Sequence, residues 1–174
     1  MLMTEEYRAL NAKLHEDNPE YGSFGAKARH KVRVLSQWGR LPILDWACGK
    51  ATLAKSLGPA YMVTNYDPAI PAFAAPPEPH PVVVAGDCLE HIEPEFLDAA
   101  IAELWRLTVG KGLFIVHLRP AKKTLPDGRN THLTVKPAEW WMDKLVRAGF
   151  RVIESHTDKG KPPMEATFVV ERAY

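Results

Sequence analysis

The sequence has 174 residues, of which 22 are lysine or arginine and 21 are acidic, for a formal net charge of +1. A chain of this length fits one domain and can bury roughly 70% of the surface that its unfolded form exposes, so it needs neither a disulfide nor a metal to fold. The small net charge gives no general attraction to nucleic acid or anionic lipid. It disfavours nucleic acid as a partner, although a local basic patch could still bind it.

The N-terminal stretch and the cysteine content indicate the compartment. Residues 1–22 carry acids where a secretory signal would have a basic stretch, and they contain no apolar run long enough to span a membrane. Only Cys48 and Cys88 are present, which gives no disulfide framework and suits a reducing environment. We expect a cytoplasmic protein without a membrane partner, and the sequence does not indicate its oligomeric state.

Two helices are predicted in residues 1–40, the first over 5–16 and the second over 26–38. Thr4 can cap the first, whose opening turn is acidic. We expect both to form a helical cap on a core of residues 41–174, within one domain that spans 1–174.

From residue 41 onward, apolar strand patterns alternate with helical patterns. The expected strands are 41–47, 60–67, 81–87, 111–120, 150–157 and 166–174, and the expected helices are 50–58, 94–107 and 137–149. The proline-rich segment 68–80 excludes a normal helix or central strand. This order predicts an α/β three-layer sandwich with a mostly parallel sheet, an antiparallel terminal strand and a shortened connection after the second strand.

Three acids stand at the expected carboxyl ends of successive strands, namely Asp45, Asp67 and Asp87. In an open parallel sheet, ligands bind beyond these ends, where the strand order reverses. The stretch "ILDWACGK", residues 43–50, therefore reads as a strand and tight turn at the edge where a ligand would bind.

These segments resemble the class I S-adenosylmethionine-dependent methyltransferases of the small-molecule type. "ILDWACGKATLA" is similar to the family's first motif, "YDPAI" to its second, and "VVVAGDCLEHI" to the strand and turn beside the transferable methyl group. The resemblance implies a Rossmann-like fold with S-adenosyl-L-methionine as cofactor. Lys50 and Ala51 stand where a second glycine is common, and the segment 68–80 replaces a helix and strand that would contact adenine.

The resemblance also implies which residues hold the cofactor. Asp67 would accept bonds from both ribose hydroxyls, Asp45 would receive the ammonium of the methionine portion, and Gly49 would let the backbone approach the cofactor. The full expected set is Asp45, Ala47, Cys48, Gly49, Asp67, Pro68, Asp87, Cys88 and Leu89.

Glu90 and His91 are the expected catalytic residues, with His91 as the general base because an unperturbed imidazole titrates near neutrality. The alternative is a capping acid and a histidine that only shapes the cleft.

The polar connection 121–136 is longer than a turn requires, which indicates a lid over the methyl acceptor. The acceptor-binding candidates at the end of the fourth strand and in this loop are His117, Arg119, Arg129, Asn130 and His132. If the loop is only a structural connection, the acceptor site moves toward the N-terminal segment around Tyr21.

Cys48, Cys88, His91 and His117 could in principle converge on zinc. They lack the paired Cys-x-x-Cys or histidine spacing of such sites, so the sequence predicts no metal site.

The sequence thus predicts a methyltransferase that acts on a small polar acceptor, which could be a small molecule, a sugar or a nucleotide. The alternative is a non-catalytic S-adenosylmethionine-binding or regulatory subunit on the same fold. A nucleotide-dependent oxidoreductase or epimerase would need a Gly-x-Gly-x-x-Gly turn, and "ACGKAT" has one glycine.

Overall fold

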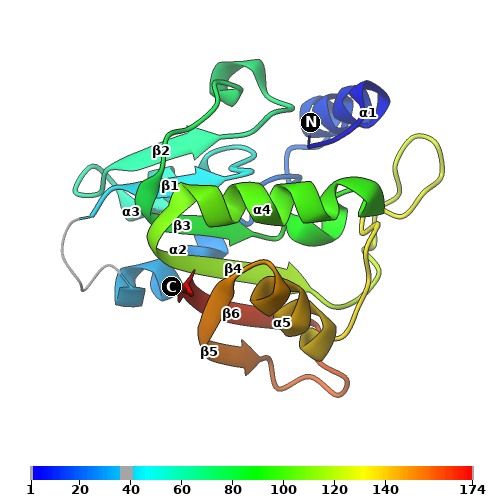
Figure 1. Cartoon of the computed structure of the whole chain (residues 1–174). Helices are drawn as coiled ribbons and strands as arrows, with labels where there is room; N and C mark the ends of the chain where they lie inside the picture. The colour runs from blue at the N-terminus through cyan, green and yellow to red at the C-terminus, as the bar shows by residue number, and fades with distance from the viewer. Residues whose placement is uncertain (1, 36–40, 174) are drawn as a thin grey trace.

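A computed structural model describes residues 2–35 and 41–173, in which six strands form one sheet in the order β2-β1-β3-β4-β6-β5 (Figure 1). Strands β1 to β4 are mutually parallel, whereas β6 runs antiparallel to both of its neighbours. This arrangement confirms the predicted α/β class and the mostly parallel sheet. The strands are β1 (Ile43–Trp46), β2 (Val63–Tyr66), β3 (His80–Gly86), β4 (Thr108–His117), β5 (Phe150–Thr157) and β6 (Glu165–Arg172).

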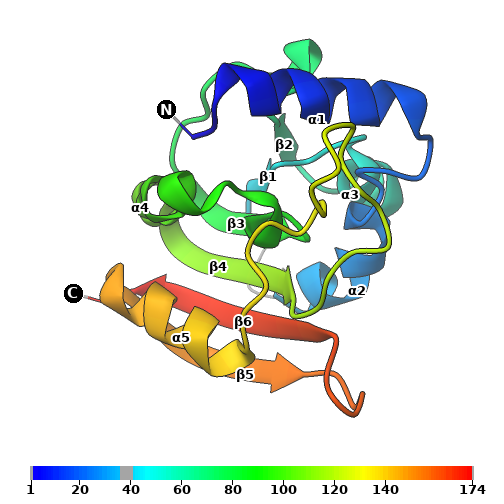
Figure 2. The same cartoon turned by 90° about the vertical axis from the view of Figure 1, so that its right-hand side faces the viewer.

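Helices cover both faces of the sheet, and one helix lies apart from these layers. Helices α4 and α5 pack on one face and α2 and α3 on the other, while α1 crosses above the sheet beside the loop that follows β4 (Figure 2). None of the described helices is long and apolar enough to cross a membrane. The helices are α1 (Glu5–Asp17), α2 (Gly25–Leu35), α3 (Thr52–Leu57), α4 (Leu97–Leu107) and α5 (Ala138–Arg147).

Strand β4 shows how the sheet separates the two halves of the core. Successive side chains of a strand point to opposite faces. Phe114 accordingly lies in the same core cluster as Trp141 of α5, whereas Ile115 lies in the cluster that contains Val32 of α2. Because both faces are buried, the strand is continuously apolar from Leu113 to Val116, as its sequence indicates.

Helix α2 differs from its expected place in an N-terminal cap. Its residues Ala28 and Val32 are buried against Ile43 of β1, so α2 is one of the layers of the sandwich. Among the α-helices of the described residues, only α1 lies outside these layers. The predicted last turn of the second helix, 36–38, lies outside the described residues.

The connection between β2 and β3 is short, as predicted. A single 3₁₀ turn, η2 (Pro71–Phe73), stands where a helix and strand would otherwise fit. The Phe73 carbonyl accepts a hydrogen bond from the Asp67 amide at 3.0 Å, which folds the segment back over the end of β2.

Replacing Phe114 by alanine tests the packing of the larger core. The side chain is fully buried, and its ring centroid lies 5.3 Å from that of Phe150. We expect Phe114→Ala to lower the free energy of unfolding by about 3–5 kcal/mol, measured by urea denaturation, because it leaves a cavity. Val109→Ala is the control in the same strand, since Val109 is 49% exposed and should cost less than about 1 kcal/mol. Similar losses in both variants would contradict the described core.

Candidate functional site

The strand order reverses at β1, because β2 lies on one side of it and β3 on the other. A crevice opens beyond the carboxyl ends of strands at such a reversal. The structure brings Asp45, Asp67 and Asp87 together at this edge, where all three line a cavity of about 440 Å³. That volume is typical of a small-molecule site.

The turn after β1 is tight and partly left-handed. Ala47, Gly49 and Ala51 have φ angles of +58°, +52° and +53°, a region that side chains rarely adopt. A Cβ on Gly49 would lie 2.5 Å from the carbonyl oxygen of Gly22. The glycine is therefore required by the close approach of the chain's own N-terminal segment, which the sequence did not indicate, and the turn still faces the cavity.

Asp67 links the turns that follow β1 and β2. Its Oδ2 accepts a hydrogen bond from the Gly49 amide and its Oδ1 accepts one from the Ala69 amide, each at 3.0 Å. Because a carboxylate oxygen has two lone pairs, both oxygens keep the capacity to accept a further hydrogen bond from a ligand in the cavity.

Asp45 is a buried acid whose carboxylate lacks a full set of hydrogen-bond partners. It is 5% exposed, and its Oδ2 has no hydrogen-bond partner. Burial, together with the nearby charge of Asp67, raises the pKa of Asp45 from 3.8 to about 7. This carboxyl would gain from a cationic group placed beside it.

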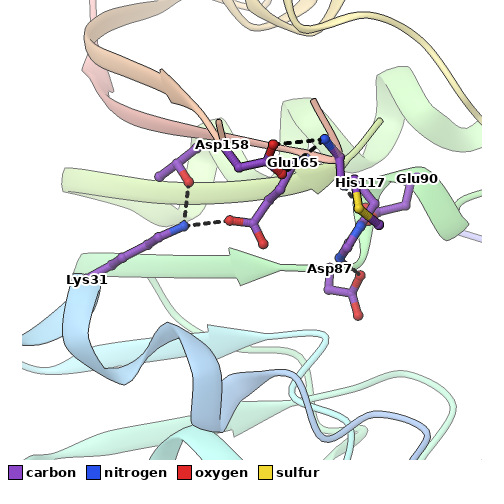
Figure 3. A network of polar contacts seen from close by, with 8 residues as sticks. Lys31, Asp87, Glu90, His117, Asp158 and Glu165 are labelled. Carbon is purple, nitrogen blue, oxygen red and sulfur yellow. Dashed lines mark hydrogen bonds and ion pairs between the residues drawn. The ribbon is translucent and has the colours of Figure 1, made fainter. Parts of the chain in front are cut away.

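His117 ends β4 and is held by two acids (Figure 3). Its Nε2 lies 3.3 Å from Oδ1 of Asp87, and its backbone amide donates to Oε1 of Glu90 at 2.7 Å. The ring of His132 lies beside it at a centroid distance of 5.4 Å, and also 4.7 Å from the ring of His91. Three imidazoles and two carboxyls thus gather at the back of the cleft.

His91 and Glu90 occupy different environments from the one expected for a catalytic pair. His91 lines the cavity, but burial, followed by the proximity of His132, lowers its pKa to about 3. Glu90 is fully buried and lies off the cavity wall, as does Leu89. The assumption of an ordinary histidine pKa fails for His91, which is neutral and a weak proton acceptor at neutral pH.

Two of the predicted acceptor-binding residues lie away from the cavity wall. Arg129 is paired with Asp127 at 2.7 Å, while the Asn130 side chain bonds both backbone groups of Ala121 and the amide of His132. These contacts within the loop use the side chains that we had assigned to the acceptor.

The other three candidates do reach the wall, namely His117, Arg119 and His132. Arg119 lies along it while its guanidinium donates to the carbonyls of Pro162 and Pro163. The loop therefore covers the cavity, but it does so with Lys122, Lys123 and Thr131 as well as His132.

Sequence reasoning missed most of the wall that α1 and the segment after it supply. Its residues include Tyr7, Asn11, His15 and Phe24, together with Tyr21, around which the sequence placed the alternative acceptor site. The first three are spaced by four, which places them on one helical face, and this pattern of polar and aromatic residues was a readable signal. The Tyr7 hydroxyl donates to the carbonyl of His91, so α1 closes the cleft from above.

Comparison with known proteins identifies the fold family. No protein-family model matches the sequence, and no curated protein matches it. Among solved structures, the chain resembles the 1,6-didemethyltoxoflavin-N1-methyltransferase of Burkholderia thailandensis, bound to its heterocycle and S-adenosylhomocysteine. The TM-score is 0.74 at 14% identity over 100% of this chain and 92% of that one. The chain has the class I methyltransferase fold.

Two further structures show the breadth of this fold. The magnesium protoporphyrin IX methyltransferase of Synechocystis PCC 6803 with bound S-adenosylhomocysteine matches at TM-score 0.62 and 16% identity, over 85% of this chain and 83% of that one. The [4+2]-cyclase SpnF matches at TM-score 0.58 and 15% identity, over 84% and 81%. Because a cyclase shares the methyltransferase fold, the reaction must be argued from the site.

The pH dependence of stability tests the buried state of Asp45. Its pKa is raised on folding, so the folded state binds more protons between pH 3.8 and about 7, and stability falls as pH rises through that window. Asp45→Asn removes this contribution. Urea denaturation should show the wild type losing roughly 3–4 kcal/mol more than the variant between pH 4 and pH 8.

Asp98→Asn is the matched control, because Asp98 has an 81% exposed side chain and should leave the pH profile of the wild type unchanged. Parallel profiles for the wild type and Asp45→Asn would contradict the raised pKa of Asp45.

Proposed function

We propose that the protein is an S-adenosylmethionine-dependent methyltransferase acting on a small polar acceptor. The main support for this proposal is the cavity at the point where the strand order reverses. The turn after β1 and Asp67 line one side of it, and the His117–Asp87 pair lines another. A cofactor held on the first side would present its methyl group toward the second.

The cofactor would be held by polar groups that have unused hydrogen-bonding capacity in the structure. The free lone pairs of Asp67 suit the two ribose hydroxyls, and the unpartnered oxygen of Asp45 suits the ammonium of the methionine portion. The backbone of 47–49 and the side chains of Pro68, Asp87 and Cys88 complete the wall. The sulfonium is a cation, which an acidic cleft stabilises. Solved neighbours of this fold hold S-adenosylhomocysteine.

The reaction would be an in-line displacement at the methyl carbon. An oxygen or nitrogen of the acceptor forms the new bond, and the electrons of the breaking carbon–sulfur bond stay on sulfur as S-adenosylhomocysteine. The acceptor's proton passes to His117, whose Nε2 side faces Asp87. We assign the base to His117 in place of His91 because His117 lines the cavity in contact with Asp87, whereas burial lowers the pKa of His91 to about 3. Glu90 positions His117 through its backbone amide.

The walls of the cavity indicate a planar acceptor with hydrogen-bonding edges. Aromatic and imidazole rings of Tyr21, Phe24, His117 and His132 surround it, and such rings stack on flat heterocycles. The 1,6-didemethyltoxoflavin bound to the Burkholderia enzyme belongs to this chemical class. The covering loop brings two lysines, Lys122 and Lys123, to the rim, which favours a polar acceptor over a lipid.

Cofactor binding can be tested without an acceptor. The wild type should bind S-adenosylhomocysteine in titration calorimetry. Asp67→Ala should weaken this binding by about 1–3 kcal/mol, or about 5- to 150-fold, through the lost bonds to the ribose and the loosened Gly49 turn. Asp143→Asn, an exposed change on α5, should bind like the wild type. Equal affinities for Asp67→Ala and the wild type would remove Asp67 from the cofactor site.

Methyl transfer can be followed with methyl-labelled S-adenosylmethionine and mixtures of small heterocycles or cell extracts. Once a labelled product identifies an acceptor, His117→Ala should lower kcat by roughly 10²–10⁴ with cofactor affinity unchanged. His156→Ala is the control, because His156 is exposed on β5.

A larger loss in His91→Ala than in His117→Ala would return the base to His91. Cofactor binding without transfer to any acceptor would favour the non-catalytic binding subunit.

A further inference from the structure

Four side chains with metal-binding atoms converge at the back of the cleft. Asp87, Glu90 and His91 come from the segment after β3, and His132 comes from the loop after β4. One ligand atom from each residue lies within 4.8 Å of the others. Because His91 and His132 lie 41 positions apart in the sequence, the sequence shows no ligand motif here.

Two of these groups have a buried polar atom that is left unpaired. Glu90 is 0% exposed, yet its Oε2 has no hydrogen-bond partner, and the same holds for Nδ1 of His91. An unpaired buried carboxylate oxygen is costly, so it requires either a shared proton or a bound cation.

In three of the four residues, another polar atom of the side chain already makes a hydrogen bond within the protein. Oε1 of Glu90 accepts from the His117 amide, Nδ1 of His132 bonds the carbonyl oxygen of Arg119, and the His91 ring bonds the backbone of Thr131. Metal-ligating histidines commonly use one nitrogen for the metal and the other for such an orienting contact. Nε2 of His132 and Nδ1 of His91 are thereby left for a ligand.

The carboxyls of Asp87 and Glu90 also contact each other. Two carboxylates have no hydrogen-bond donor between them, so the contact is favourable only with a shared proton or a cation. Nε2 of His117 also lies 3.3 Å from Oδ1 of Asp87. A divalent cation would neutralise both acids.

We propose that Asp87, Glu90, His91 and His132 bind a divalent first-row transition metal ion such as Zn²⁺. Two imidazoles and two carboxylates form a mixed nitrogen and oxygen set, which suits zinc or iron better than magnesium or calcium. Zinc–ligand bonds of about 2.0–2.2 Å separate tetrahedral ligands by about 3.4 Å, so ligand atoms within 4.8 Å of one another would close by at most about 1.4 Å. His132 stands on a loop, which can supply that movement.

An ion at this place would lie beside His117, which is outside the ligand set and stays available as a base. On the proposed function, the ion would polarise the acceptor heteroatom that attacks the methyl group. Metal binding itself does not require methyl transfer or the cofactor.

The test uses the full chain, stripped with EDTA and titrated with ZnCl₂ by calorimetry and with CoCl₂ by visible absorption. We expect one saturable site per chain and a cobalt spectrum of nitrogen and oxygen ligands without thiolate charge-transfer bands. His132→Ala and Asp87→Asn should each weaken binding at least about tenfold, since even outer-shell partners commonly contribute that much. Circular dichroism checks that each variant folds.

His80→Ala is the matched histidine control, because His80 starts β3 at the far end of the strand and bonds Glu78 and Thr64. It should bind zinc like the wild type. Absence of saturable binding would overturn the site and leave a shared proton between the carboxyls. Equal affinity in the wild type and His132→Ala, or thiolate bands in the cobalt spectrum, would also overturn it. S-adenosylhomocysteine titrated in parallel separates the proposals, because metal binding and cofactor binding can each fail alone.

Discussion

The carboxylate of Asp67 is the interaction on which the described site depends. It joins the turn after β1 to the turn after β2 through the amides of Gly49 and Ala69. Strands β1 and β2 are each only four residues long, so few ladder bonds fix the ends from which these turns leave. The charge-assisted bonds hold the two turns in register, and the N-terminal segment packs against the same point through Gly22. The wall proposed for the cofactor is therefore assembled from three separate parts of the chain.

The cleft concentrates negative charge away from water. Burial raises the pKa of Asp45, Asp87 and Glu90, because each carboxylate loses hydration that the protein does not fully replace. A cationic ligand would offset the free energy lost when these carboxylates are desolvated. The ammonium and sulfonium of the proposed cofactor would do so near Asp45, and the proposed metal ion would do so between Asp87 and Glu90. The two proposals thus rest on one electrostatic property of the site, at different places.

Local patterns predicted the architecture well, because strand periodicity and acids at strand ends depend on neighbouring residues. The strand 150–157 was predicted with the observed bounds, and Asp87 was placed at the cleft. The site's finer structure depends on side-chain contacts that these patterns do not give. Arg129 pairs with Asp127 of its own loop, and the pKa of His91 reflects burial that no motif encodes. The spacing of Tyr7, Asn11 and His15 indicated that they share one face of α1, but it did not indicate that this face lines the cavity.

A crystal structure with S-adenosylhomocysteine tests the central claim most directly. The account predicts that the ribose hydroxyls lie within hydrogen-bond distance of the Asp67 carboxylate and that the ammonium approaches Asp45. The sulfur would then face the His117–Asp87 pair, and the methyl group of the donor would lie beside that pair. A ligand bound elsewhere, or with its ribose away from Asp67, would contradict the assignment of this cavity as the site of methyl transfer.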